Sequence, residues 1–246
     1  MKILKSSILL AATVLASSAF AGGYTTEAPH SKPALFAQLE GGYTWDTMGS
    51  TTFSFVGPTS TFTGGPAETT SGGTGVLSFG AIHYSSAHPD LSYTGEMGWG
   101  YYGKREFTVR SNIIDSKNYI YGFDLLAGVD YQFTPMFDVF FKLGALLENV
   151  RLVRNTNLNA LGASVISNET STVSSVIPEL KLGGIYNITD VWGLSLAYMH
   201  AFGNTPSMSV TKTIAAPGDV TSSNYSSTGA PISLNTVLAG LVYKFD

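Results

Sequence analysis

An alternation of apolar and polar side chains between Tyr119 and Phe133 constrains this chain more than any other feature. In YIYGFDLLAGVDYQF, every second residue from Tyr119 is apolar, with aromatic rings at both ends and aliphatic residues in the middle. The intervening positions include glycines and the aspartates Asp124 and Asp130. Because successive side chains of a strand point to opposite faces, this pattern predicts a strand with one apolar and one polar face. Rings at the two ends are typical of a wall that crosses hydrocarbon between two interfaces.

The same period of two recurs in seven further segments, which gives eight predicted strands. The other segments are Leu35–Trp45, Gly75–Tyr84, Leu91–Tyr102, Phe137–Glu148, Pro178–Ile188, Trp192–Phe202 and Ser233–Phe245. No stretch beyond the N-terminus is continuously apolar for the roughly 20 residues that a membrane helix needs. The pattern therefore indicates an all-β protein.

The connections between these segments alternate between short and long. Three are short: Ser85–Asp90, Thr134–Met136 and Thr189–Asp190. Four are long and rich in Ser, Thr, Gly and Asn: Asp46–Thr74, Gly103–Asn118, Asn149–Ser175 and Gly203–Pro231. Short turns at one rim and long loops at the other are typical of outer-membrane barrels. An open sheet edge in hydrocarbon would leave backbone groups without partners, so closure is required. We expect an eight-stranded antiparallel up-and-down transmembrane β-barrel with short periplasmic turns and four long extracellular loops.

The N-terminus predicts the export route. Residues 1–21 combine two early lysines, an apolar centre and a small-x-small end at Ala19-Phe20-Ala21, which is typical of a cleaved signal peptide. The alternative, a retained membrane helix, is disfavoured because the apolar centre is short. We expect residues 22–34 to form a periplasmic tail and residues 35–246 to form the barrel, in the outer membrane of a Gram-negative bacterium.

Composition excludes several classes of function. Charged residues make up only 12% of the chain, about half of the globular norm. The formal net charge is −4 and becomes more negative if Lys2 and Lys5 are cleaved off, which argues against a nucleic-acid partner. The absence of cysteine excludes disulfides and thiolate metal sites.

The signal peptide, the eight alternating segments and the terminal stretch VLAGLVYKF resemble the small outer-membrane β-barrels of the OmpA/OmpX and Opa-like type. The resemblance implies the barrel fold, outer-membrane lipid and lipopolysaccharide as surroundings, and recognition of the last strand by the barrel assembly machinery. Here Asp246 follows the terminal aromatic Phe245, which departs from the usual signal.

Charged residues on the inward faces form the candidate site. They fall near mid-height or somewhat above it, and we expect them to pair or to trap water, because an unpaired buried charge is costly. This predicted lumen charge cluster consists of Glu40, Glu96, Asp124, Lys142, Glu148, Glu179 and Lys181. Asp138 and Lys244 fall near the periplasmic rim. The cluster acts either as a gate in a narrow conducting lumen or as a structural polar core, and the small interior favours the core.

The four histidines are the candidates for catalytic or metal-binding residues. His200 falls on the outward face near the outer end of its strand, with no serine and carboxylate completing a triad. His83 and His88 lie near a periplasmic turn, His30 lies before the first strand, and no pair has metal-ligand spacing on one strand face. We therefore expect no catalytic residue, no cofactor and no metal, and no enzymatic activity.

The leading hypothesis is a structural and surface-interaction protein with an adhesin-like role, whose exposed loops contact a host or cell-surface ligand. A small porin with a charged, gated lumen is the alternative, and a lipid-modifying outer-membrane enzyme comes third. A soluble lipocalin-like barrel would place apolar residues inside, which is the reverse of the predicted distribution.

Overall fold

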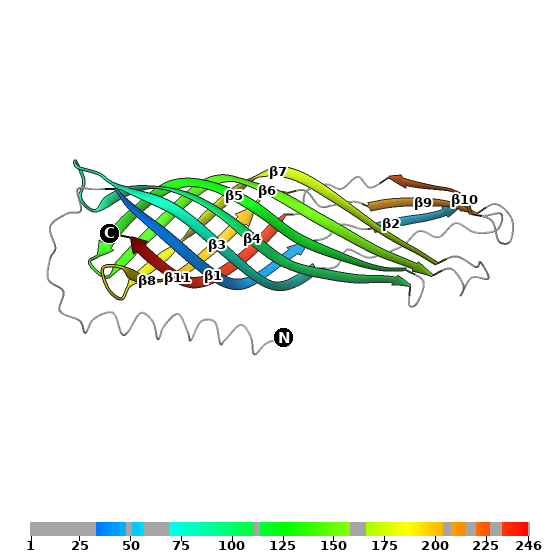
Figure 1. The fold of residues 1–246 in the computed structure, drawn as a ribbon, viewed down its shortest axis with the longest axis horizontal. Coiled ribbons are helices and arrows are strands. Elements are labelled where there is room, and N and C mark those ends of the chain that lie inside the picture. The colour runs from blue at the N-terminus through cyan, green and yellow to red at the C-terminus, as the bar shows by residue number, and fades with distance from the viewer. Residues whose placement is uncertain are drawn as a thin grey trace.

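The computed structural model describes the chain at residues 33–47, 51–56, 69–110, 114–157, 166–203, 208–214, 220–226 and 233–245. Most of these residues lie in strands (Figure 1). The main sheet contains β1 (Ala34–Thr47), β3 (Thr69–Tyr84), β4 (Leu91–Arg110), β5 (Ile114–Thr134), β6 (Phe137–Asn157), β7 (Ile166–Asn187), β8 (Trp192–Ala201) and β11 (Leu234–Phe245). A separate sheet contains β2 (Thr51–Val56), β9 (Met208–Ile214) and β10 (Val220–Ser226).

The main sheet is a closed antiparallel barrel in which β11 returns to pair with β1. This confirms the predicted eight-stranded architecture. Following the register from Glu40 in the two directions around the barrel reaches Glu148 and Asp138, which lie ten residues apart on β6. The sheet is therefore strongly staggered, as closure of tilted strands requires, and an eight-stranded barrel has an interior that side chains can fill.

Short turns join the strands at the end of the barrel where β1 begins and β11 ends (Figure 1). They span residues 85–90, 135–136 and 188–191, close to the predicted positions. Backbone hydrogen bonds tie these turns to neighbouring strands, as from Lys244 N to Val191 O at 2.8 Å. Among the described residues there is no helix of the length and apolarity needed to cross a membrane.

The opposite end differs from the prediction of four long loops. Two of these, residues 103–118 and 149–175, are mostly strand, because β4 continues to Arg110 and β6 continues to Asn157. β4 to β7 stay paired after the alternation of apolar and polar residues has ended. A search for alternation in the sequence cannot detect this part of the strands. The other two expected loops contain β2, β9 and β10, while residues 57–68, 204–207, 215–219 and 227–232 lie outside the described part of the chain.

The predictions for the chain ends are only partly covered by the structure. The predicted signal peptide, most of the predicted periplasmic tail and Asp246 lie outside the described residues. Pro33 and Ala34 are described, and Ala34 already begins β1.

The faces of the strands sort as alternation predicts. Outward side chains of the opening segment are exposed, including Phe123 at 45% and Leu125 at 60%. Their inward neighbours Asp124 and Leu126 are each 2% exposed. The outer surface of the barrel is thus an apolar band, and most of the charge at this height lies inside.

Candidate functional site

The candidate site is the interior of the barrel, where each residue of the predicted lumen charge cluster is at most 2% exposed. The residues of this cluster come from five strands and face inward because each occupies the polar face of its strand. They are Glu40 (β1), Glu96 (β4), Asp124 (β5), Lys142 and Glu148 (β6), and Glu179 and Lys181 (β7).

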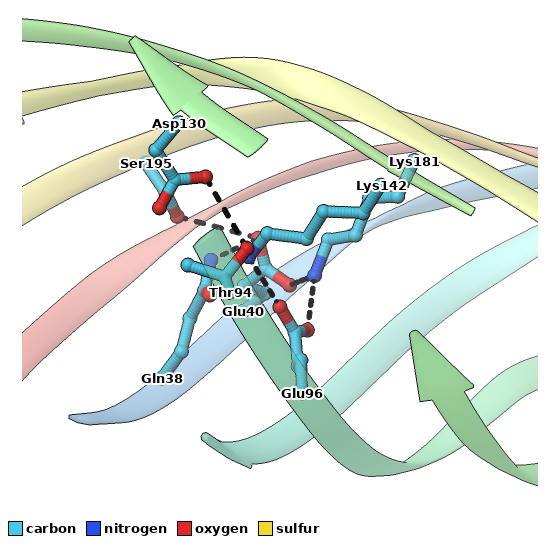
Figure 2. Close-up of polar contacts among 8 residues, drawn as sticks. All are labelled: Gln38, Glu40, Thr94, Glu96, Asp130, Lys142, Lys181 and Ser195. Carbon is cyan, nitrogen blue, oxygen red and sulfur yellow. Dashed lines mark hydrogen bonds and ion pairs between the residues drawn. The ribbon is translucent and has the colours of Figure 1, made fainter. Parts of the chain in front are cut away.

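Lys181 bridges two carboxylates across the barrel (Figure 2). Its Nζ lies 2.7 Å from Glu40 Oε2 and 2.8 Å from Glu96 Oε1. Glu40 Oε1 also accepts hydrogen bonds from Gln38 at 2.6 Å and from Ser195 at 3.3 Å. This arrangement joins β1, β4, β7 and β8, so one cation connects walls that are not neighbours in the sheet.

Lys142 completes the paired part of the cluster. Its Nζ donates to Glu96 Oε2 at 2.6 Å (Figure 2). The same Nζ lies 5.2 Å from the ring centroid of Phe36 and 4.7 Å from that of Phe140, within the range of cation–π attraction. Both rings occupy space left by glycines: a Cβ at Gly80 would meet Phe36, and one at Gly183 would meet Phe140. Lys142 and these rings therefore fill the lumen.

Three predicted members lie outside this paired group. Both carboxylate oxygens of Glu179 and Oδ1 of Asp124 are buried without a hydrogen-bond partner. Glu148, two residues beyond the Leu146 that pairs with Asp124, has contacts of its own. The structure thus brings Glu40, Glu96, Lys142 and Lys181 into direct contact and leaves Asp124, Glu148 and Glu179 outside these ion pairs.

Arg105 is a buried cation that the sequence analysis missed. Its side chain is fully buried, and its Nε lies 3.1 Å from Asp46 Oδ2. The pairing of β4 with β5 shifts between Tyr101 and Lys104, where Gly103 adopts a φ of +100°. This bulge exchanges the two faces of β4, so that Arg105 turns inward while Lys104 and Glu106 turn outward. A glycine within a strand often marks a bulge. The sequence does not single out Gly103, however, because β4 contains three further glycines.

Two smaller polar groups complete the interior. Thr44 shares hydrogen bonds with Thr74 and with Thr236, the second at 2.8 Å, on the side of the barrel where β1 meets β3 and β11. Near the short turns, Asn187 donates to Asp138 at 2.9 Å, and Lys244 lies 3.8 Å from the same carboxylate. Asp138 and Lys244 therefore lie at the rim beside the short turns, where the sequence placed them.

The described histidines, His83, His88 and His200, lie as the sequence indicated, away from the lumen cluster, while His30 lies outside the described residues. His200 is half-buried on the outer surface, where its Nδ1 lies 2.9 Å from Asn235 Oδ1, and the hydroxyl of Tyr198 donates to the same oxygen at 2.8 Å. His83 and His88 are exposed. Within the described ranges, no three acidic or histidine side chains are arranged to hold a metal ion.

The interior side chains can close the lumen and connect strands on different sides of the barrel. Ion pairs cross it at mid-height, rings pack beside them, and the Arg105–Asp46 pair lies further along the barrel. Among the described residues that are buried, carboxylates outnumber cations. The carboxylates are Glu40, Asp46, Glu96, Asp124, Asp130, Glu148 and Glu179, and the cations are Arg105, Lys142 and Lys181.

Comparison with known proteins gives matches only at the level of structure. No family model matches the chain, and no curated protein matches it. The chain is similar to Ail, the attachment invasion locus protein of Yersinia pestis, at 11% identity and a TM-score of 0.41, covering 85% of this chain and 98% of Ail. It is also similar to Neisserial surface protein A, at 14% identity and a TM-score of 0.37, covering 87% and 99%. The N-terminal barrel of Pseudomonas aeruginosa OprF matches at 7% identity and a TM-score of 0.37, covering 87% and 100%.

Proposed function

We propose that this chain is an integral outer-membrane β-barrel protein with a structural and surface-interaction role. The observation that carries the proposal is the reversed distribution of polarity. Large apolar side chains such as Leu125 and Phe79 are exposed at 60% and 51%, while Lys142 and Lys181 are buried. Exposing such a band to water is unfavourable, whereas hydrocarbon accommodates it.

The aromatic side chains support an orientation across the membrane. Near the short turns, outside the barrel, the ring of Tyr243 packs at a tilt against Trp192 and edge-to-face against Phe245, with centroids 4.8 and 4.9 Å apart. At the other end of the band, Trp45 and Tyr198 approach at 6.4 Å. Rings at both edges are typical of the two membrane interfaces. Under this proposal the short turns face the periplasm, and the last strand is the segment that the assembly machinery recognises.

The surface-interaction role rests on the part of the molecule beyond the apolar band. β4 to β7 continue well past the ends of β1, β8 and β11, and the separate sheet of β2, β9 and β10 lies toward the same end of the molecule (Figure 1). We name the segments 104–119 and 151–172 the projecting hairpins. Ordered strands that rise from the cell surface offer a fixed platform for a host or cell-surface ligand, which fits an adhesin-like role.

The test removes the platform and keeps the barrel. Residues 106–117 and 152–171 are each replaced by Asn-Gly, which favours a two-residue turn. This keeps the buried Arg105 and Asn118, which lie opposite each other on β4 and β5. A non-adherent bacterium that displays equal amounts of either form is then assayed for attachment to epithelial cells. We expect the full chain to promote attachment and the trimmed chain to lose it. Equal attachment by the two forms would contradict the role of the hairpins.

A gated porin is the second candidate. The observation that favours it is the set of ion pairs across the lumen, which would act as the gate. The paired charges and the rings of Phe36 and Phe140 fill mid-height, so we expect no steady conductance from the wild-type barrel in a planar bilayer. If the pairs are a gate, Lys142→Met would open measurable channels. If neither the wild type nor Lys142→Met conducts ions, the ion pairs are not a gate and the structural role stands.

A further inference from the structure

Two carboxylates inside the barrel form no ion pair with any described side chain. Asp124 on β5 and Glu179 on β7 are each 2% exposed. Both carboxylate oxygens of Glu179 and Oδ1 of Asp124 lack a hydrogen-bond partner among the described residues. The buried cations are engaged elsewhere: Arg105 with Asp46, Lys142 with Glu96, and Lys181 with Glu40 and Glu96. Because a buried charge without a partner is costly, these two carboxylates need a bound cation or a proton.

The register brings Asp124 and Glu179 to the same height. Asp124 lies opposite Leu146 on β6, and Leu146 lies opposite Ile177 on β7. Glu179 is two residues further along β7 toward the short turns, which is the direction in which the stagger of the closed sheet shifts residues of equal height. Among the charged groups, Asp124 also has the largest electrostatic effect on Glu179. Two groups of like charge therefore lie near each other in the lumen.

The hydroxyl of Ser78 borders the same space as the carboxylate of Asp124. Ser78 lies opposite Gly98 on β4, and Gly98 lies opposite Asp124. A Cβ at Gly98 would lie 3.0 Å from Ser78 Oγ and 2.7 Å from Asp124 Oδ1, so both oxygens flank the space that this glycine leaves open. Ser78 is fully buried, and its Oγ has no hydrogen-bond partner within the described ranges. Ser78 therefore presents a neutral oxygen to this space, independently of the carboxylates.

Tyr102 adds a second buried hydroxyl. Its side chain is fully buried and folds back over Gly100, where an added Cβ would lie 2.7 Å from the hydroxyl oxygen. Its strongest electrostatic interactions are with Glu179 and then with Asp124. No hydrogen bond of normal geometry satisfies this hydroxyl within the described part of the chain. Two hydroxyls and two carboxylates, from four strands, thus gather in one part of the lumen.

This set of groups has the chemistry of a site for a hard cation. All of its donor atoms are oxygens, which calcium and magnesium prefer. A divalent ion neutralises both carboxylates, whereas one proton neutralises only one. Calcium accepts about six to eight oxygen ligands in a flexible arrangement, including bidentate carboxylates and water, whereas magnesium demands a near-ideal octahedron. Groups that project from four separate strands suit calcium better.

We propose that Asp124 and Glu179, together with the hydroxyls of Ser78 and Tyr102, bind a calcium ion inside the barrel. The ion links β3, β4, β5 and β7 beside the Lys181 ion pairs, on the side away from the short turns. The sequence analysis expected no metal because the ligands come from four strands and no single strand shows a ligand pattern. The inference goes beyond the proposed surface role, since it concerns the interior of the barrel and does not depend on any ligand of the projecting hairpins.

The test measures calcium bound by the refolded, full-length mature chain in zwitterionic detergent, using equilibrium dialysis. A background of sodium chloride suppresses weak binding to surface charges. At free calcium of about 1 mM, which is the range of weak extracellular calcium sites, we expect one ion per barrel. An equal concentration of magnesium should displace little of it. Failure to retain calcium, or its full displacement by the magnesium, would overturn the proposal.

Thermal unfolding provides a second measurement on the same samples. A ligand that binds only the folded chain raises the midpoint of unfolding as its concentration rises. The wild type should therefore unfold at a higher temperature in calcium than in chelator. Equal midpoints in the two conditions would overturn the site.

Two nearly isosteric variants locate the ligands. Glu179→Gln and Asp124→Asn should each weaken calcium binding by roughly a hundredfold. In chelator, each variant should be at least as stable as the wild type, because it removes a buried carboxylate that has no partner. Wild-type calcium affinity in either variant would overturn the site. A loss of stability in chelator would also overturn it, since the carboxylate would then have a stabilising partner without calcium.

Two further variants separate this site from the general negative charge of the lumen. Asp130→Asn is the matched control, because Asp130 is a buried carboxylate on the same face of β5, roughly 20 Å along the strand from Asp124, and accepts a hydrogen bond from Thr94 at 3.5 Å. It should keep the calcium affinity of the wild type, and a loss equal to that of Asp124→Asn would overturn the site. Tyr102→Phe keeps the ring and should weaken binding by roughly tenfold. Unchanged affinity in Tyr102→Phe would overturn the assignment of its hydroxyl.

Discussion

The apolar band of the barrel and the projecting hairpins belong to the same strands but follow different rules. Within the band, side chains alternate strictly, as in Leu125 at 60% and Leu126 at 2% exposed, and the major ion pairs lie inside. Beyond the bulge at Gly103, charged side chains such as Lys104 and Glu106 lie on the outside. The backbone ladder continues through both regions. The surroundings therefore impose the alternation, whereas the sheet needs only paired backbone groups.

The largest expected effect comes from the interior of the band. Lys181→Met removes the cation shared by Glu40 and Glu96 and leaves two buried carboxylates near each other. Breaking a buried pair in this way costs about 3 to 5 kcal/mol, so the free energy of unfolding should fall by that order. Equilibrium denaturation in lipid vesicles measures it.

Lys142→Met provides the comparison, since Glu96 keeps Lys181 and the loss should be smaller. Adding Glu40→Gln to Lys181→Met should recover part of the loss, because the residues share a network. Strictly additive effects would show that Lys181 and Glu40 do not interact.

The second prediction sets the outer faces of the two regions against each other. Ala127→Arg places a charge within the apolar band and should lower the free energy of unfolding in lipid by about 2 to 4 kcal/mol. Asn155→Arg, at an exposed outward position of a projecting hairpin, should be nearly neutral. Similar losses for both variants, measured by the same vesicle denaturation, would abolish the distinction between the regions.

The third prediction concerns the joint between them. Gly103 has a φ of +100°, and a Cβ there would lie 2.6 Å from Arg105 Nη1. Gly103→Ala should therefore cost about 1 to 3 kcal/mol. Gly95→Ala is the matched control on the same strand, because nothing lies within 4 Å of its added Cβ. If thermal unfolding in detergent gives equal values for both variants, the bulge carries no strain.

The sequence predicted the band well because hydrocarbon imposes a pattern that can be read residue by residue. It predicted which face carries Asp124 and Lys142, and it predicted the closed barrel. It did not predict that Arg105 faces inward. The bulge at Gly103 exchanges the two faces of β4, so counting alternate residues from the start of the strand assigns Arg105 to the wrong face. The projecting hairpins were missed for a related reason: pairing without alternation leaves no periodic signal.

The partners of each interior charge were harder to predict than its direction. Alternation placed Lys142 and Lys181 in one cluster but did not assign their partners, and Lys181 is the residue that contacts both Glu40 and Glu96. The stagger of the closed sheet decides which residues reach the same height, and no single strand contains that information. Asp124 and Glu179 were expected to share the network, yet Oδ1 of Asp124 and both carboxylate oxygens of Glu179 have no hydrogen-bond partner among the described residues.

One measurement tests the division between band and projection most directly. The sequence contains no cysteine, so single cysteines at Leu125 and Asn155 can carry a small fluorophore in an otherwise native chain. The barrel is folded into vesicles and exposed either to brominated lipid or to aqueous iodide. We predict that lipid-borne bromine quenches the label at 125 and iodide quenches the label at 155. Iodide quenching at 125, with bromine ineffective there, would contradict the membrane-spanning barrel.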